Sequence, residues 1–395
     1  MPLSSKPKVL LVAGWYPSDE SPYAGVFVRD QALGLAELCD VAVLHVELGN
    51  RDSDIELTVE DSILVARIGV AASPPLVLGA KAGRAYAASV GYLHAAERGY
   101  RALLDEWGEP DILHAQVTGP AGYGAWWLNR RHHIPYVITE HSAEFLSESG
   151  EYRRRGRISR FLMRRAGRSA GAVIAVSRFQ SRAIQAHGIA REPDIIPNIV
   201  RPMKVTPMPS ATSGVVVGHV SLMVDSSKDI SGLLAAMRLV ADERSDVQLL
   251  LAGDGPDRLA LTAKARKLGL LGTSVEFVGP VRAERIDEFY ARCHFTVVSS
   301  RYETFCMAAA ESLMSGRAVL STRCGGPEDF LIPTVGRFVP ASQPKALALG
   351  LVSMADDIGR YGPADVARYA QSEFAARQVA QQIVEVYTRV ISASG

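Results

Sequence analysis

Short apolar runs alternate with longer helical stretches through the first half of the chain, and this alternation limits the fold more than any other feature. Buried parallel strands are continuous runs of Val, Ile and Leu, and their crossovers need a dozen or more residues, as the segment Phe27–Leu38 provides. We therefore predict a doubly wound α/β sheet. Its strands are expected at Val9–Ala13, Val41–Val46, Ile112–Ala115, Tyr136–Thr139 and Ala172–Val176.

A second α/β series follows a break in the pattern. Prolines accumulate within residues 196–213, where neither a helical nor a strand period survives, and this is typical of a linker. The second set of strands is expected at Val215–Val220, Val247–Ala252, Val275–Val278, Phe295–Ser299 and Ala318–Ser321. We predict two Rossmann-like domains, residues 1–200 and 201–374, that face a central cleft. Ligands of such sheets bind beyond the carboxyl ends of the strands.

Composition excludes several classes of protein. The chain has 395 residues and a formal net charge of +1, with 22% charged and 48% hydrophobic residues, which is the balance of an ordinary globular protein. Nothing in the bulk charge indicates nucleic acid. The four cysteines lack metal-ligand spacing, so we expect neither disulfides nor a metal site. The chain has no cleavable signal and no apolar run long enough for a membrane span, so we expect a cytoplasmic protein.

Glu303 and Glu311 give the first indication of chemistry. If a helix begins near Thr304 or Phe305, the two carboxylates lie roughly 12 Å apart along it and about 80° apart around it, so both could line one ligand. The N–H groups of the first turn and the helix dipole would then favour a diphosphate. Helix capping is the alternative, because glutamates are common at helix starts.

Several motifs occur in order along the chain. Those of the second half are SSKDISGLLAAM, LLLAGDGP, VEFVGPV and SRYETFCMAAAESLMSGRAVLSTRCGGPED, and those of the first are GWYPSDESPYAGVFVRDQALGLAE, TEHS, AVIAVS and IIPNIV. Together they resemble glycosyltransferase family 4, whose members are retaining enzymes of the GT-B fold. The resemblance implies transfer of a sugar from a nucleotide-diphosphate sugar, UDP- or GDP-linked, to an acceptor hydroxyl in glycan, glycolipid or natural-product glycoside biosynthesis. It also implies an acceptor-binding first domain, onto which a helix at 375–395 packs back, and a donor-binding second domain.

The resemblance assigns residues to the donor. Lys228 would bind the diphosphate, where a cation offsets the charge that builds on the leaving group. Glu303 would act as a catalytic residue near the transferred sugar, and Glu311 would hold both ribose hydroxyls with its two oxygens. Val281 would contact the nucleobase. Backbone N–H groups facing the donor are expected from Thr304, Phe305 and Cys306.

One position departs from the family pattern. Many relatives have an arginine six residues before the lysine, and this chain has Leu222. The leaving-group clamp is then weaker, or another cation substitutes. Arg301 and Arg323, in the loops on either side of the helix that carries Glu311, are the candidates.

In the first domain the resemblance points to Gly25 and His141. Gly25 matches a glycine loop that lets the backbone approach the donor phosphate and the acceptor, with one glycine in place of the usual pair. His141 would act as a catalytic residue against the donor sugar, and Glu140 would orient it. Retaining members are thought to react on one face, with a phosphate oxygen taking the acceptor's proton. No protein nucleophile, cofactor or metal is therefore expected.

Alternatives stay open for the function and for one surface. The chain could be another GT-B enzyme, such as a sugar-nucleotide epimerase, or a non-catalytic sugar-nucleotide-binding protein. Eight arginines fall between Arg153 and Arg168. A helix here would place Ile158, Phe161, Leu162 and Arg165, at i, i+3, i+4 and i+7, on one inward face while the remaining arginines face water. The other interpretation is contact with an anionic membrane or a lipid-linked acceptor, which would hold the protein at the inner face of the membrane.

Overall fold

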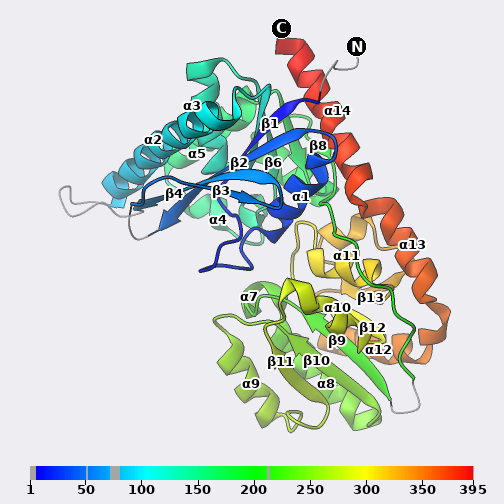
Figure 1. Ribbon diagram of the computed structural model, residues 1–395. Helices are drawn as coiled ribbons and strands as arrows, with labels where there is room; N and C mark the ends of the chain where they lie inside the picture. The colour runs from blue at the N-terminus through cyan, green and yellow to red at the C-terminus, as the bar shows by residue number, and fades with distance from the viewer. Residues whose placement is uncertain (1–5, 50–51, 72–80, 211–213, 395) are drawn as a thin grey trace. The chain divides into compact units, whose positions relative to one another are not determined.

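The computed structural model describes residues 6–49, 52–71, 81–210 and 214–394. The chain divides into two compact units. One unit holds the chain up to Ile199 and again from Ala376, and the other holds Val200–Ala375. The end of the predicted linker, residues 211–213, lies outside the described residues. Figure 1 labels the helices and strands of both units.

The first unit is built on an eight-stranded sheet in the order β3-β4-β2-β1-β5-β6-β7-β8. Neighbouring strands are parallel, except that β3 and β4 form an antiparallel hairpin at one edge. The predicted doubly wound sheet is confirmed, and the β3–β4 hairpin is an addition to it. The strands are β1 Lys8–Ala13, β2 Asp40–Gly49, β3 Glu56–Glu60, β4 Ile63–Ala71, β5 Ile112–Gln116, β6 Tyr136–Glu140, β7 Ala172–Ala175 and β8 Asp194–Ile195.

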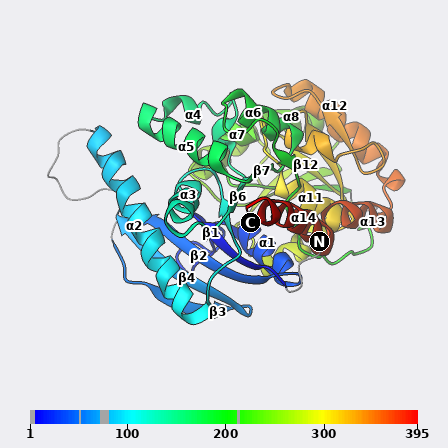
Figure 2. The ribbon, with the colours of Figure 1, turned by 90° about the horizontal axis from the view of Figure 1, so that it is seen from above.

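Helices cover both faces of this sheet because its strands are apolar on both sides. In β1, Leu10 and Val12 face one core, while Val9, Leu11 and Ala13 face the other, as the two-residue period of a strand requires. Figures 1 and 2 show α2 and α3 over the first of these faces and α1 and α14 over the second. The helices are α1 Val26–Ala36, α2 Lys81–Trp107, α3 Ala121–His132, the 3-10 turn η1 Ala143–Phe145, α4 Glu151–Arg154, α5 Arg157–Ser169, α6 Arg178–Ala186 and α14 Ala376–Ser394.

The second unit has a six-stranded, wholly parallel sheet in the order β11-β10-β9-β12-β13-β14. Its strands are β9 Val215–Val220, β10 Val247–Ala252, β11 Val275–Gly279, β12 Phe295–Val298, β13 Ala318–Thr322 and β14 Gly336–Val339. Its helices are α7 Asp225–Lys228, α8 Ile230–Glu243, α9 Arg258–Lys267, η3 Ala283–Arg285, α10 Ile286–Ala291, α11 Met307–Met314, η4 Gly326–Asp329, α12 Pro344–Asp356, η5 Ile358–Arg360 and α13 Pro363–Phe374.

In both sheets the strand order reverses beside the first strand of the unit. In the first unit β1 lies between β2 and β5, and in the second unit β9 lies between β10 and β12. Open parallel sheets bind their ligands at such switch points, beyond the carboxyl ends of the strands. The loops after β1, β5 and β6 in the first unit, and after β9 and β12 in the second, are therefore where functional side chains should lie.

Candidate active site

Lys228 and Glu303 form an ion pair at the switch point of the second unit. Lys228 ends α7, which follows β9, and Glu303 lies in the loop after β12. The Lys228 Nζ lies 2.5 Å from Oε1 of Glu303, and the Ser300 hydroxyl donates to the same oxygen at 2.6 Å. The family resemblance assigned both residues to the donor without predicting that they touch.

The Lys228–Glu303 pair is mostly shielded from water, with side chains 23% and 12% exposed. Burial lowers the pKa of Lys228, but the charge and hydrogen bond of Glu303, together with the nearby Cys306 and Cys324, raise that pKa above its ordinary value overall. His219 in β9 is buried, and burial lowers its pKa to about 4, so it stays neutral. The site thus offers a permanent cation to an anionic ligand and a carboxylate to hydroxyl groups.

Helix α11 begins at Met307, so the predicted start at Thr304 or Phe305 is wrong. Cys306, which precedes it, has a φ of 80°, in the left-handed region that residues with side chains rarely adopt. A right-handed helix cannot run back through this conformation, and Thr304, Phe305 and Cys306 form a loop in front of the helix. That their N–H groups face the donor stays a prediction.

Glu303 is held by the loop after β13 and not by the helix. Its N–H donates to the Cys324 carbonyl at 2.7 Å, and its own carbonyl accepts from the Gly326 N–H at 2.9 Å. A Cβ on Gly326 would lie 2.6 Å from the main chain of Phe305, so this close approach requires glycine. Because Glu303 lies outside α11, the helical separation predicted for it and Glu311 does not apply.

Glu311 lies within α11, beside the buried phenol of Tyr290. The Tyr290 hydroxyl lies within hydrogen-bonding distance of Oε2 of Glu311, at 3.3 Å. Burial, and then the charge of Glu311, raise the pKa of Tyr290 well above its ordinary value, so the phenol stays protonated and donates. The ribose role predicted for Glu311 stays a prediction.

Leu222 lies in the loop after β9 with 64% of its side chain exposed, where the family arginine would be. Both candidate replacements are paired with carboxylates. Arg301 bonds to Asp229, the residue directly after α7, which ties it to the segment that carries the site lysine. Arg323 is 61% exposed and pairs with Glu328 at 3.1 Å. That either arginine acts beside the leaving group stays a prediction.

Two glycines after β10 shape the loop after β9. A Cβ on Gly253 would lie 1.9 Å from the carbonyl oxygen of Ser221, and one on Gly255 would lie 2.7 Å from the main chain of Met223. The GDGP turn is thus a packing device that supports the loop, as its sequence indicates. Val281 is half-buried just beyond the end of β11, and its contact with a nucleobase stays a prediction.

The loop after β1 lies close to His141 in the first unit. Gly25, which precedes α1, has a φ of 70°, and a Cβ there would lie 2.5 Å from the Trp15 carbonyl group. Only glycine allows this packing. Two residues further on, the ring of Phe27 packs against His141 with 4.6 Å between centroids. The structure therefore brings together the two first-unit residues that the sequence singled out.

The His141 imidazole is buried and held by other side chains. Its Nε2–H donates to Oε1 of Gln116 at 2.8 Å, and Gln116 in turn donates to Oε1 of Gln31 at 2.7 Å. A further side-chain hydrogen bond joins His141 to Asn198. Burial lowers the pKa of His141 to about 3, so the imidazole is neutral at physiological pH. A neutral imidazole can contact a substrate but does not act as a general acid.

Glu140 binds the main chain of the loops after β5 and β6, not the His141 ring. Its carboxylate accepts from the N–H groups of Thr118, at 2.8 Å, and of His141, at 3.0 Å.

Sequence reasoning missed Gln31 and Gln116, which hold the imidazole of His141. Gln116 ends β5, so its place at the carboxyl end of a predicted strand was a usable signal, whereas nothing local marks Gln31.

The four cysteines are buried free thiols. Burial raises the pKa of Cys306 well above its ordinary value, which keeps this thiol, the one nearest the glutamates in sequence, from acting as a nucleophile. Within the described ranges, no group of three or more His, Cys, Asp and Glu side chains could hold a metal ion.

Two family models match the chain, one on each unit. Residues 24–198 match the Glycosyl transferase 4-like domain, and residues 217–363 match Glycosyl transferases group 1. The chain belongs to this glycosyltransferase family. The resemblance read from its motifs is confirmed, and Lys228 and Glu303 both fall within the second matched range.

Curated relatives of this chain are matched over part of their length. The GDP-mannose-dependent alpha-mannosyltransferase of Mycolicibacterium smegmatis is 36% identical over 23% of this chain and 22% of its own. The phosphatidylinositol N-acetylglucosaminyltransferase gpi3 subunit of Schizosaccharomyces pombe is 28% identical over 36% and 32%. The alpha-monoglucosyldiacylglycerol synthase of Streptococcus pneumoniae is 26% identical over 53% and 51%. The chain thus spans about half or less of each of these relatives.

Solved structures match the chain over almost its whole length. Sucrose-phosphate synthase from Thermosynechococcus elongatus has a TM-score of 0.77 at 20% identity and covers 98% of this chain and 100% of its own. Anabaena HepE in complex with UDP and glucose has a TM-score of 0.70 at 19% identity and covers 97% and 99%. At these identities the matches show the fold, which is GT-B as predicted.

Proposed function

We propose that this glycosyltransferase moves a sugar from a nucleotide-diphosphate sugar to an acceptor hydroxyl, with retention of configuration. The Lys228–Glu303 pair at the switch point of the second unit is the observation that supports it. A cation and a carboxylate in contact suit a ligand that has an anionic diphosphate next to a polyhydroxylated sugar. In this proposal Glu311 anchors the ribose and Val281 contacts the base.

Donor binding exchanges the partners of the two charges. The diphosphate attracts the Lys228 ammonium away from Glu303. The Glu303 oxygen that Lys228 had bound then accepts hydrogen bonds from sugar hydroxyls. In transfer, the bond from C1 to the diphosphate oxygen breaks and the acceptor oxygen bonds to C1 on the same face. The acceptor's proton passes to a phosphate oxygen. Lys228 then stabilises the leaving diphosphate, and Glu303 stabilises positive charge at C1.

We assign donor binding to the second unit and acceptor binding to the first. The loop at Gly25 approaches the acceptor, and the neutral His141 contacts the donor sugar without transferring a proton. The donor is a UDP- or GDP-sugar, since a relative is named for GDP-mannose and a structural neighbour holds UDP. Transfer requires no metal in this proposal, because Lys228 supplies the cation beside the diphosphate.

A two-step assay tests the function. UDP-glucose, UDP-N-acetylglucosamine and GDP-mannose are first compared by thermal shift, since a donor at 100 times its Kd adds about 2.7 kcal/mol of stability. The donor that binds is then incubated, with and without EDTA, with phosphatidylinositol or diacylglycerol vesicles. We expect a glycoside with retained anomeric configuration by NMR and a rate that EDTA does not change. An epimerised donor, or binding without any product, would contradict the proposal in favour of an epimerase or a binding protein.

Helix α5 does not pack as its periodicity predicted. Ile158 and Phe161 are 60% and 66% exposed, so the predicted inward stripe is wrong for them, and the core-facing residues are Met163 and Ala166. Exposed apolar side chains among arginines fit the headgroup boundary of an anionic bilayer. We infer that the arginine-rich surface, residues 153–168, docks on such a membrane at its inner face. In the described part of the chain, no helix is both long and apolar enough to span a bilayer.

Some arginines of this surface have structural partners. Arg155 forms a two-pronged ion pair with the buried Glu144, with nitrogen–oxygen distances of 2.7 and 2.9 Å. Changing Arg155 would leave that carboxylate buried without its cation, so it cannot report on membrane binding alone. Arg157 and Arg160, beside Phe161 on α5, are the better positions for a test.

Replacing Arg157 and Arg160 with glutamate should weaken binding to anionic vesicles. Each basic side chain near an anionic surface contributes about 1 kcal/mol, so losing two corresponds to at least a 30-fold lower partition coefficient. Phe161→Ser should also weaken binding, and the matched control is Leu259→Ser, which removes an 86% exposed leucine from α9. Sedimentation with phosphatidylglycerol vesicles measures the effect. Equal binding by the double variant and the original chain would contradict docking through this surface.

A further inference from the structure

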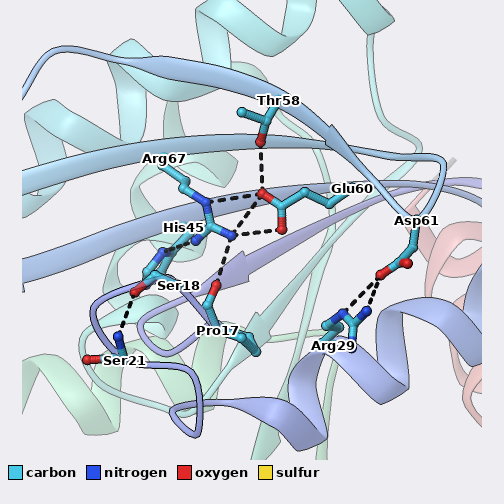
Figure 3. Close-up of polar contacts among 9 residues, drawn as sticks. All are labelled: Pro17, Ser18, Ser21, Arg29, His45, Thr58, Glu60, Asp61 and Arg67. Atoms are coloured by element: carbon cyan, nitrogen blue, oxygen red, sulfur yellow. Dashed lines mark hydrogen bonds and ion pairs between the residues drawn. The ribbon is translucent and has the colours of Figure 1, made fainter. Parts of the chain in front are cut away.

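Arg67 ties the β3–β4 hairpin to the loop after β1, as Figure 3 shows. On the hairpin side, its Nη2 lies 2.9 Å from each carboxylate oxygen of Glu60, and its Nε lies 3.2 Å from one of them. On the loop side, Nη2 donates to the Pro17 carbonyl at 2.8 Å. The Arg67 side chain is only 18% exposed, so this guanidinium is a fixed element of the structure.

His45 extends the contact to the beginning of the same loop. Nη1 of Arg67 lies 3.2 Å from Nδ1 of His45, and because guanidinium can only donate, Nδ1 is the acceptor. His45 also hydrogen-bonds the main chain of Gly14. Burial, and then the charge of Arg67, lower the pKa of His45 to about 4. The imidazole is therefore neutral at physiological pH, and its Nδ1 stays free of a proton to accept from Arg67. The guanidinium lies over the ring of Tyr16, 5.3 Å from its centroid.

Trp15 is the residue that these contacts enclose. Its neighbours on both sides are held, Gly14 by His45 and Tyr16 by Arg67, and its own carbonyl packs against Gly25. The residue is nevertheless 42% exposed. A tryptophan with a fixed main chain and an exposed ring is pre-organised for contact, since little freedom remains to be lost on binding.

We propose that Arg67 is a positioning residue which fixes the loop after β1 so that Trp15 forms a contact surface for the acceptor. The loop lies at the switch point of the first unit, where ligands of such sheets bind. This inference rests on the proposed function, because it takes the first unit as the acceptor side.

The chemistry of an indole indicates which part of an acceptor it would meet. The faces of an aromatic ring carry partial negative charge, and they pack well on the apolar C–H face of a saturated, polyhydroxylated ring. Trp15 therefore fits a sugar or cyclitol ring better than an open-chain alcohol. Free sugars and lipid headgroups share this ring, so the test uses ring probes of both kinds.

Fluorine NMR of the full chain labelled with 5-fluorotryptophan tests both parts. The chain has four tryptophans, and the Trp15 signal is the one absent from Trp15→Phe. In Arg67→Met we expect the Trp15 signal to shift, with a smaller shift in Arg67→Lys, which keeps the charge but cannot reach all three partners. The other three signals should stay in place, which shows that the fold is intact. The control is Arg29→Met, because Arg29 pairs with Asp61 on the same hairpin, whereas the Pro17 carbonyl of the loop accepts from Arg67.

Titration with methyl α-D-glucopyranoside and with myo-inositol, both in the presence of UDP, tests the contact. We expect either ring to move the Trp15 signal while glycerol does not, and Arg67→Met to weaken that binding by about tenfold. A response to the glucopyranoside alone indicates a sugar acceptor, and a response to myo-inositol alone indicates a cyclitol headgroup. An unmoved Trp15 signal in Arg67→Met overturns the positioning role, and no response to either ring overturns the contact role. Neither readout needs turnover, so a failed transfer assay would count against the proposed function alone.

Discussion

Replacing Lys228 with methionine should lower the rate of sugar transfer by about 10²- to 10³-fold, the loss seen when one preorganised group facing a developing oxyanion is removed. Methionine keeps the length and apolar stem of lysine but has no charge to offer a leaving diphosphate. The Michaelis constant for the donor should rise as well, because the same cation contacts the diphosphate before transfer. Initial rates at saturating donor separate the two effects.

The matched control for Lys228→Met is Lys264→Met, which removes an exposed lysine from α9 in the same unit. It should leave both constants unchanged. A Lys228→Met chain that keeps a tenth or more of the original rate would contradict the leaving-group role. Arg301, which pairs with Asp229, the residue directly after Lys228, would then be the next cation to replace.

The sheets could be predicted from the sequence because their central strands are continuous apolar runs. The β3–β4 hairpin lacks such runs, because β3 alternates polar and apolar residues, as antiparallel edge strands do, and Arg67 interrupts the apolar pattern of β4. The contacts of Arg67 could not be predicted either. They join residues that only the strand order brings together.

The start of α11 shows a different limit. No capping residue stands before Met307, and the left-handed Cys306 belongs to a loop packed on Gly326 from the next strand connection. Local propensity therefore favoured a helix two or three residues too long. On α5, the period correctly put Ile158 and Phe161 on one face, but a period does not say whether other residues cover that face.

The Lys228–Glu303 contact falls between these cases. The two residues are far apart in sequence, yet they follow β9 and β12, which are neighbours in the sheet. Parallel strands bring their carboxyl ends to one edge, so knowing the switch point would have been enough to predict that the two residues meet.

Glu303→Gln should lower the turnover number by about 10²-fold while changing the Michaelis constant for the donor little. Glutamine is isosteric, and its carbonyl oxygen can still accept from Ser300 and Lys228, so the local structure should persist. What it lacks is the negative charge that opposes positive charge at C1, which exists only in the transition state. The pKa of Lys228 should also fall, because the Glu303 carboxylate does most to raise it.

Glu311→Gln is the matched comparison, since it removes the same charge from the same unit at the predicted ribose contact. It should raise the Michaelis constant for the donor and leave the turnover number close to the original, because a ribose contact is equally strong before and during transfer. Steady-state kinetics of both variants with one donor make the distinction. If Glu303→Gln retained the full turnover number, Glu303 would be a structural partner of Lys228 and not a catalytic residue.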